Sequence, residues 1–353
     1  MTGQEPLRLG LLGAARITDL AVIKPARVTG TRLVAVAARD PSRAAAFADA
    51  HGVEKVHESY LDVINDPDVE AVYNPLANSI HAPWNKAALD AGKHVFTEKP
   101  SASNAAEAED VAALARTTDR QFFEGFHYLW HPLVARLHEI LAGGELGELR
   151  HIETVMDMPA PAATDPRWSL DLSGGALMDL GCYSLHSLRL LAPTLGGEPT
   201  LVSATGGERP GHPGIDEWLT AELEFPNGVT GTAGCNMASD HHQMSHRLIG
   251  TKGEATIVDF VNPHDDDRLV VTTAAGRRTE HLGRRSSYTY QLEAFTSAVR
   301  TGVPARTDAD DAVLTMRLID QCYEAVGLAP RPSRSSPSDP HTHSDTRSWS
   351  DPR

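Results

Sequence analysis

A lysine followed by a proline stands at the end of a short apolar run that is typical of a buried strand. The tripeptide Glu98-Lys99-Pro100 comes directly after residues 94–97, well downstream of a glycine-containing turn near the N-terminus. In a doubly wound parallel sheet, ligands bind beyond the carboxyl ends of the strands. The position therefore makes Lys99 a candidate catalytic residue that reaches a substrate beside a bound dinucleotide.

Polar side chains also recur on an otherwise apolar segment that follows the glycine pair Gly174-Gly175. If this segment is helical, Asp179, Tyr183 and His186 lie at i, i+4 and i+7, on one face. A polar stripe on a buried helix must face hydrogen-bond partners or a binding site. A nearby Lys99 would suit Tyr183, because an ammonium favours the phenolate and lowers a tyrosine pKa from about 10. The alternative is an internally satisfied hydrogen-bond network.

The N-terminal glycine turn has the form of a dinucleotide site with an altered fingerprint. The segment Gly13-Ala14-Ala15-Arg16-Ile17-Thr18 follows an apolar strand and opens a helical pattern, with Ala15 at the usual middle glycine. Such a turn directs the free N–H groups of a helix N-terminus at a pyrophosphate. The methyl group of Ala15 narrows this approach without preventing it. A glycine turn that binds nothing is the alternative.

The end of the second predicted strand indicates which dinucleotide is preferred. A site for NAD usually has an acidic residue there, which binds the ribose 2′-hydroxyl. This chain has Ala38 instead, followed by Arg39 and, one helical turn later, Arg43. Arginine pairs well with phosphate, so the sequence predicts NADP and leaves NAD open. Alternatively, Arg39 is a solvated loop residue and Asp40 only caps the next helix.

Further histidines are weaker candidates. His127, Tyr128 and His131 follow the last predicted parallel strand, where they either line the site or pack at a domain junction. Residues 240–246 contain several histidines but no thiolate and no ligand spacing typical of zinc. The sequence therefore predicts no metal site.

The elements that position these residues alternate between strand and helix in the first third of the chain. The predicted strands are 7–12, 33–37, 69–73, 95–97 and 122–123, and the predicted helices are 44–51, 60–64, 81–91 and 105–115. This alternation implies a parallel sheet with right-handed crossovers. The fold class is therefore α/β, with an N-terminal Rossmann domain built on a doubly wound parallel sheet.

The pattern changes after residue 127. A helix at 132–142 is followed, between about 200 and 281, by successive strands with little helix, and Asn227-Gly228 is typical of a hairpin turn. Strands without crossovers imply a C-terminal α+β domain with a large open, mostly antiparallel sheet. Two helices, at about 288–300 and 308–326, complete this half.

We therefore divide the chain into three parts. Residues 1–127 are the predicted NADP-binding Rossmann domain, and residues 128–330 the substrate-binding and oligomerisation domain. Residues 331–353 are nearly all polar or proline, which cannot support a core, so they are predicted to be a disordered tail.

Composition excludes several classes of function. The net charge of -15 argues against non-specific binding to nucleic acid or anionic membranes. No apolar run is long enough to span a membrane, and the N-terminus has no export signal. The three cysteines are far apart and odd in number, which fits a reduced cytoplasm. We therefore expect a cytoplasmic protein.

With these residues in view, the chain resembles the glucose-fructose oxidoreductase / inositol dehydrogenase / rhizopine-catabolism (Gfo/Idh/MocA) oxidoreductase family over about residues 7–328. It is nearest the branch with dimeric dihydrodiol dehydrogenase and NADP-linked sugar dehydrogenases. The most specific parts are Glu98-Lys99-Pro100, residues 73–81 and residues 174–186. The resemblance implies an oligomer, a homodimer or homotetramer, built through the open sheet. Inositol dehydrogenases have histidine where Tyr183 stands, which disfavours inositol as the substrate.

The resemblance also implies the roles of the site residues. Lys99 and Tyr183 are the implied catalytic pair, with Asp179 positioning the substrate or the pair. The expected cofactor-binding residues are Gly13, Ala15, Arg16, Ile17, Arg39, Arg43, Asn74, Leu76, His81, Glu98 and Lys99. The expected substrate-binding residues are His127, Tyr128, Arg167, Trp168 and His186.

The leading interpretation is an NADP(H)-dependent oxidoreductase that acts on a sugar or another cyclic polyol or diol. A nucleotide-sugar ketoreductase of a biosynthetic pathway is the second, with Arg136, Arg167 and Arg189 as candidate diphosphate ligands. A non-catalytic NADP-sensing regulator of the same fold is a third, although it should have lost Lys99 and Tyr183. A glycosidase that uses bound NAD transiently is a fourth.

Overall fold

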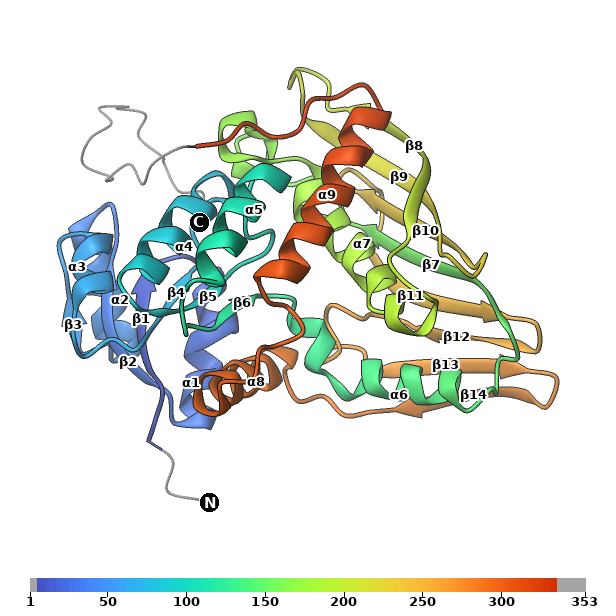
Figure 1. The fold of residues 1–353 in the computed structure, drawn as a ribbon, viewed down its shortest axis with the longest axis horizontal. Coiled ribbons are helices and arrows are strands. Elements are labelled where there is room, and N and C mark those ends of the chain that lie inside the picture. Colours follow the sequence, from blue (N-terminus) through green and yellow to red (C-terminus); the bar gives the residue numbers. More distant parts are fainter. Residues whose placement is uncertain (1–4, 335–353) are drawn as a thin grey trace.

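The computed structural model describes residues 5–334, which form two sheets with their helices (Figure 1). The first sheet has the order β3-β2-β1-β4-β5-β6, and every neighbouring pair is parallel. Its strands are β1 (Arg8–Leu12), β2 (Arg32–Ala37), β3 (Lys55–Val56), β4 (Ala71–Asn74), β5 (His94–Thr97) and β6 (Phe122–Glu124). The predicted Rossmann sheet is confirmed, and β3 is a two-residue strand that the apolar pattern missed.

Helices connect these strands, and their starts follow local capping chemistry. The helices are α1 (Lys24–Thr29), α2 (Pro41–His51), α3 (Tyr60–Asn65), α4 (His81–Asp90) and α5 (Ala105–Ala115). The Asp40 side chain accepts a hydrogen bond from the Ser42 backbone N–H at the start of α2. Asn104 caps α5 in the same way through the Glu107 N–H. Side-chain oxygens thus satisfy amides that a helix N-terminus leaves unpaired.

The second sheet has the order β14-β13-β12-β11-β7-β10-β9-β8. Its strands are β7 (Leu149–Asp157), β8 (Thr200–Glu208), β9 (Asp216–Glu224), β10 (Thr230–Asn236), β11 (Gln243–Gly250), β12 (Gly253–Ile257), β13 (Arg268–Thr273) and β14 (Gly276–His281). Among the strand pairs of this second sheet, within the part of the chain described, only β7–β10 is parallel. The β9–β10 hairpin turns at Gly228, whose φ of +83° suits glycine. The mostly antiparallel second sheet is therefore confirmed.

The later helices pack on both sheets. They are α6 (Pro132–Ala142), α7 (Cys182–Arg189), α8 (Ser287–Thr301) and α9 (Ala309–Ala325). In α8, the Phe295 ring lies 5.3 Å from Phe96 and 5.5 Å from Phe123, in the core of the first sheet. On α9, Arg317 pairs with Glu109 of α5. The chain therefore returns to the Rossmann sheet after residue 281, so a single boundary at residue 127 does not separate the two cores.

The C-terminal end of the ordered core lies later than expected. Arg331 is only 1% exposed, and backbone or side-chain hydrogen bonds also hold Ser333 and Arg334. Residue 331 is therefore not the start of a disordered tail, because a buried charge partner holds it in place. The remainder of that predicted tail, residues 335–353, lies outside the described residues.

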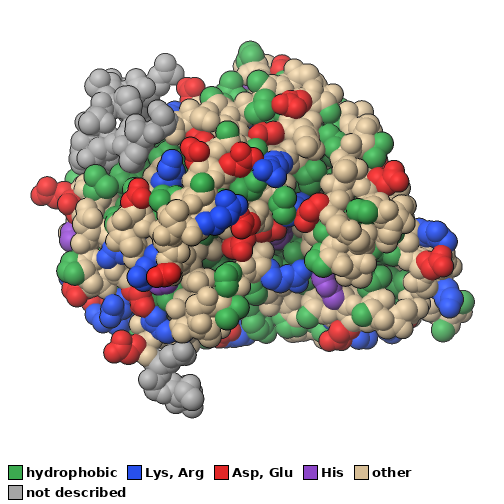
Figure 2. Space-filling model, viewed as in Figure 1, with side chains coloured by type: hydrophobic (Ala, Val, Ile, Leu, Met, Phe, Trp, Pro, Cys, Tyr) green, Lys and Arg blue, Asp and Glu red, His purple; other side chains and the backbone are tan. Residues whose placement is uncertain are grey.

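Charges of both signs are mixed on one face of the molecule. Acidic and basic side chains are interspersed over the face drawn in Figure 2. Among the described residues, no helix has the length and apolar character needed to cross a bilayer.

Candidate active site

Lys99 connects the first sheet to the helical segment that carries Asp179 and Tyr183. It follows β5 by two residues, so it lies beyond the carboxyl end of a central parallel strand. Its Nζ donates a hydrogen bond to the Asp179 backbone carbonyl at 2.7 Å and lies 3.5 Å from Asp179 Oδ1. The same Nζ lies 4.8 Å from the centre of the Tyr183 ring. The structure thus brings together the three residues that the sequence singled out for catalysis.

The helix that carries Asp179 and Tyr183 begins with an irregular turn. Residues Leu177–Gly181 form a π-helical turn, in which the Cys182 N–H bonds to the Leu177 carbonyl, and α7 follows. A π-turn inserts an extra residue and is frequent at functional sites. Asp179 and Tyr183 both face Lys99. His186, three residues after Tyr183 in α7, packs with it against Phe126 and Tyr128, but its ring nitrogens bind elsewhere.

His186 points instead into a buried network. Its Nδ1 lies 2.6 Å from the Tyr128 hydroxyl and its Nε2 lies 3.1 Å from Asp311 Oδ2. The His186 ring stacks on Phe126 at 3.9 Å. Because the polar atoms of Tyr128 and His186 are paired with one another and with Asp311, we place no substrate against either residue.

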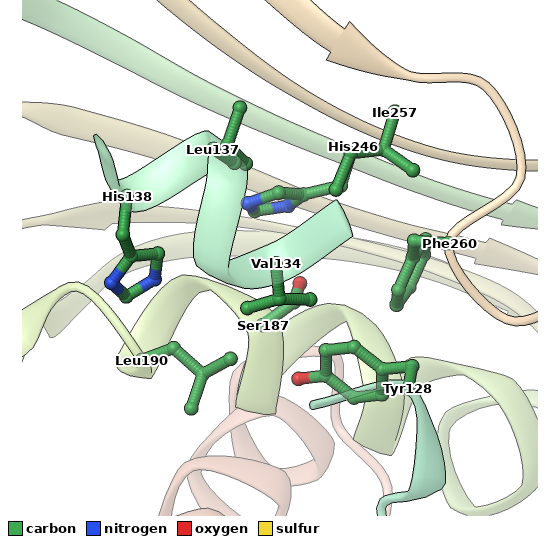
Figure 3. Close-up of a pocket in the computed structure, with 9 residues that line it drawn as sticks. All are labelled: Tyr128, Val134, Leu137, His138, Ser187, Leu190, His246, Ile257 and Phe260. Carbon is green, nitrogen blue, oxygen red and sulfur yellow. The ribbon is translucent and has the colours of Figure 1, made fainter. Parts of the chain in front are cut away.

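Tyr128 also lines a small cavity inside the second half of the molecule. Figure 3 shows this cavity lined by Tyr128, by Ser187 of α7, by Leu190 just after that helix, and by residues of α6, β11 and β12. The volume is about 10 Å³, close to the lower limit for a single water molecule. This cavity is therefore too small for a sugar or a nucleotide.

The electrostatics around Lys99 favour an ion pair and a neutral phenol. Burial lowers the Lys99 pKa, but Cys182, Asp179 and Glu98 outweigh it and the net pKa is raised. Burial raises the Asp179 pKa, but Lys99 and Arg167 outweigh it and the net pKa is lowered. Lys99 and Asp179 therefore carry opposite charges at neutral pH.

The pKa of Tyr183 differs from the sequence-based expectation. Burial raises its pKa well above 10, and Tyr288 and Glu98 add to the effect. The rings of Phe126 and Tyr128 enclose it at 5.5 and 5.9 Å. The expected lowering by Lys99 is absent because desolvation dominates and the ammonium faces the ring rather than the hydroxyl. Tyr183 thus keeps its proton at neutral pH.

Arg167 and Trp168 lie in the segment that precedes the helix carrying Asp179 and Tyr183. Arg167 Nε donates to Asp179 Oδ2 at 2.7 Å, and its side chain keeps 39% exposure. Trp168 is buried, and its indole N–H points at the Pro161 carbonyl at 3.4 Å. Arg167 therefore remains a candidate substrate ligand, whereas Trp168 serves as packing.

His127 lies next to the catalytic cluster with one ring nitrogen unused. Its Nδ1 lies 2.8 Å from Ser287 Oγ, while the buried Nε2 has no hydrogen-bond partner among the described residues. Burial lowers its pKa to about 3, with Lys99 contributing. A neutral imidazole with a free nitrogen can bind a hydroxyl group, so His127 stays a candidate substrate residue.

The glycine turn has the cradle that a dinucleotide requires. Gly13 has φ +102°, and a Cβ there would lie 3.1 Å from Leu76 Cδ2. Arg43 Nη2 donates to the Ala14 carbonyl at 3.2 Å, which holds the turn from the next helix. Ala15 and Ile17 are partly exposed, while Arg16 and Arg39 are exposed. Backbone and cations are thus available where a phosphorylated ligand would approach.

Asn74 and His81 shape the loop that faces this turn. The Asn74 amide donates to the His81 carbonyl and to Asn85 Oδ1, and its oxygen accepts from the Leu76 N–H. The two ring nitrogens of His81 lie 2.8 Å from the Leu76 carbonyl and 2.7 Å from the Pro100 carbonyl. These side chains therefore hold the loop that places Leu76, rather than presenting free polar groups.

Glu98 is buried beside Lys99. Its Oε1 accepts a hydrogen bond from the Tyr73 hydroxyl at 2.8 Å, and burial raises the pKa of the carboxyl group. The sequence reasoning missed Glu124, whose Oε1 accepts from the Ser101 N–H at 2.6 Å. Burial raises the Glu124 pKa to about 7. The signal that could have identified Glu124 is its position at the end of β6, beside β5.

Comparison with known proteins agrees with this geometry. Residues 7–126 match the model described as "Oxidoreductase family, NAD-binding Rossmann fold", and residues 134–256 match the GFO/IDH/MocA C-terminal domain. The chain is 34% identical to D-xylose 1-dehydrogenase (NADP(+)) 2 of Haloferax volcanii, covering 91% of this chain and 97% of the relative. It is also 34% identical to mouse trans-1,2-dihydrobenzene-1,2-diol dehydrogenase, with the same two coverages.

A solved structure supports the same relationship. The fold matches a 3-ketoreductase from Actinomadura kijaniata in complex with NADP and TDP-benzene, with a TM-score of 0.84 and 26% sequence identity. The match covers 91% of this chain and 98% of that chain. The two proteins therefore share the arrangement of both sheets.

Proposed function

The chain belongs to the GFO/IDH/MocA family of NAD(P)-dependent oxidoreductases, and we propose that it interconverts a CH–OH group and a carbonyl group on a sugar or cyclic diol, with NADP(H). The observation that carries the proposal is the contact of Lys99 with Asp179 and Tyr183 beyond the carboxyl end of β5. This is where doubly wound sheets bind their ligands.

In this proposal, the residues of the chain move the proton and hold the charge. Bound NADP(H) supplies or accepts the hydride. Tyr183 keeps its proton at neutral pH, so it donates to the carbonyl oxygen in the direction of reduction and must lose that proton for oxidation. Lys99 stabilises the oxygen on which negative charge develops. Asp179 keeps the ammonium charged and in place.

The turn around Gly13 and two arginines would hold the cofactor. The positive φ of Gly13 disfavours other residues, and a Cβ there would press on Leu76 Cδ2 at 3.1 Å, as expected where a backbone approaches a pyrophosphate. Arg39 is exposed beyond β2, where its guanidinium would pair with a 2′-phosphate. Arg43 would support the turn through its bond to Ala14.

A nucleotide-sugar ketoreductase is the second candidate, since the structural relative was solved with TDP-benzene. Of the three arginines considered as diphosphate ligands, Arg136 pairs with Glu280 and Glu139, and Arg189 is buried against Glu198 and Asp311. Only Arg167 keeps exposed guanidinium surface beside the cluster. A single arginine favours a free sugar or diol over a diphosphate substrate.

The test is turnover of NADP(H), followed by absorbance, with a panel of aldoses, trans-dihydrodiols and thymidine-diphosphate keto sugars. We expect turnover on the first two classes that is lost in Lys99→Met and Tyr183→Phe. Turnover confined to the thymidine-diphosphate sugars would favour the second candidate. Turnover that survives both substitutions would contradict the proposed roles.

A further inference from the structure

Among residues 5–334, Arg331 is the most deeply buried lysine or arginine, with 1% exposure. Its Nε donates to the Gly174 carbonyl at 2.8 Å and its Nη1 to the Gly214 carbonyl at 2.7 Å. Its Nη2 pairs with Asp216, and the guanidinium lies 4.0 Å from the centre of the Tyr323 ring. All three nitrogens of the guanidinium thus have partners, and the group also lies over an aromatic ring.

Asp216 continues this network into the catalytic helix. Its Oδ2 accepts a hydrogen bond from the Leu177 N–H at 2.6 Å, and its Oδ1 accepts from the Tyr323 hydroxyl at 3.0 Å. A Cβ at Gly175 would lie 2.0 Å from Asp216 Oδ1. The pair of Arg331 and Asp216 therefore holds both the turn before the helix and the first amide of the π-turn that carries Asp179.

The same C-terminal segment also binds the Rossmann half. Asn104 Nδ2, at the start of α5, donates to the Arg331 carbonyl at 2.7 Å and to Ser333 Oγ at 2.8 Å. The Arg334 N–H donates to Glu107 Oε1 at 2.6 Å. Figure 1 shows this segment running from the end of α9 toward the first sheet. We call residues 331–334 the C-terminal strap.

The C-terminal strap and the segment that follows Lys99 both contact the turn at residues 173–174. Ser173 has φ +57° and is fully buried, and its hydroxyl donates to Ser103 Oγ at 3.0 Å. Its carbonyl accepts from Asn78 Nδ2 at 3.2 Å. Ser103 and Asn104 follow Lys99 closely in the chain. The turn before the catalytic helix is thus tied on one side to the Lys99 loop and on the other to Arg331.

We propose that Arg331 is a positioning residue, which acts through the C-terminal strap to set Asp179 and Tyr183 against Lys99. The inference rests on the proposed function for its catalytic meaning. The physical reason is that Lys99 follows a strand of the first sheet, whereas Tyr183 lies in a helix bonded to the second sheet. Their separation therefore depends on how the two halves are joined. The planar fork of arginine reaches three acceptors at once, whereas the three donors of a lysine share one nitrogen.

Two substitutions test the strap while keeping its surroundings. Arg331→Lys keeps the charge beside Asp216 but loses the fork to Gly174 and Gly214. Asn104→Ser keeps the cap of α5 but loses both donors to the strap. Arg317→Ala is the matched control, because Arg317 joins α9 to α5 through an exposed pair with Glu109.

Amide hydrogen exchange of residues 174–186 measures how firmly this helix is held, and the measurement needs no substrate. We expect faster exchange there in Arg331→Lys and Asn104→Ser and unchanged exchange in Arg317→Ala. Unchanged exchange in both strap variants would overturn the proposal. If the wild-type protein shows no turnover at all, the proposed function fails and this measurement alone decides the role of the strap.

The kinetic readout separates positioning from a loss of folded protein. We expect kcat per NADPH-binding site to fall by about tenfold to a hundredfold, since misplacement by about 1 Å has that effect. The Kd of NADPH, measured by fluorescence titration, should stay within about twofold, because the strap does not touch the Gly13 turn. A kcat per binding site equal to that of the wild type would contradict a positioning role.

Discussion

Lys99 and Tyr183 meet through a face of the aromatic ring, with Nζ 4.8 Å from the ring centre and hydrogen-bonded to the Asp179 carbonyl. The lysine therefore places its positive charge over the ring of Tyr183, while the phenol stays protonated. This arrangement separates the roles of the two residues. In the proposed mechanism, Lys99 keeps its positive charge and Tyr183 carries the proton that moves.

Removal of the Lys99 charge should reduce catalysis more than binding. We expect Lys99→Met to lower kcat by about 10²–10³-fold, the effect of losing one stabilising group for developing negative charge. Steady-state kinetics and NADPH titration would measure the two effects. Lys86→Met removes an exposed pair with Asp110 and should change neither. A Lys99→Met variant with near-normal kcat would contradict the role of the lysine.

The pH dependence should differ between the two directions of the reaction. Burial places the Tyr183 pKa well above 10, so the phenol that reduction needs is present throughout the neutral range. The phenolate that oxidation needs increases about tenfold per pH unit below that pKa. We therefore expect reduction to be flat between about pH 6 and 9 and oxidation to rise. In Tyr183→Phe, both rates should fall and the slope for oxidation should disappear.

Arg39 and Arg43 should affect the cofactors differently. Loss of a charge-assisted hydrogen bond weakens binding by about 1.5–3 kcal/mol, so Arg39→Ala should raise the Kd of NADPH about tenfold or more. The Kd of NADH should change little, because NADH lacks the 2′-phosphate. Arg43→Ala should weaken both, since Arg43 holds the Ala14 carbonyl. Fluorescence titration with both cofactors checks this, and equal losses in Arg39→Ala would refute the assignment.

Glu124 should make the folded protein less stable as the pH rises. Its pKa is about 7 in the fold against an ordinary value of 4.5, so the folded state binds more protons than the unfolded state between these values. The contribution of Glu124 to stability is then highest below pH 4.5 and declines until about pH 7, by roughly 3 kcal/mol at most. Glu124→Gln keeps an acceptor for the Ser101 N–H and removes the charge.

We therefore expect Glu124→Gln to gain stability over the wild type at pH 8 and to lose that gain near pH 4.5. Urea unfolding at the two pH values measures the difference. A gain of equal size at both pH values would show that the titration of Glu124 is not its cause.

Much of the fold could be predicted because its signals are local. The alternation of apolar runs and helical patterns identified five of the six parallel strands, and Asn227-Gly228 marked the β9–β10 hairpin. The strand that was missed, β3, has two residues and pairs only at an edge. Likewise, Lys99 was identified from its place after β5, because the carboxyl ends of parallel strands share one edge of the sheet.

The errors arose where contacts distant in sequence decide the outcome. His186 was expected to bind substrate, but its ring nitrogens lie at the Tyr128 hydroxyl and at Asp311 Oδ2, which belong to other elements. The Tyr183 pKa was expected to fall beside Lys99. It rises because Phe126 and Tyr128, from another element, remove water from the phenol.

By itself, the sequence determined the two-sheet architecture, the place of the dinucleotide turn and the residue types available for proton transfer, since these depend on short-range patterns. Only the tertiary structure decided how Lys99, Asp179 and Tyr183 face one another. It also decided that Arg331, in a segment of polar composition, is buried against Asp216. The reason is that burial and charge pairing depend on partners far apart in the chain, which no local pattern records.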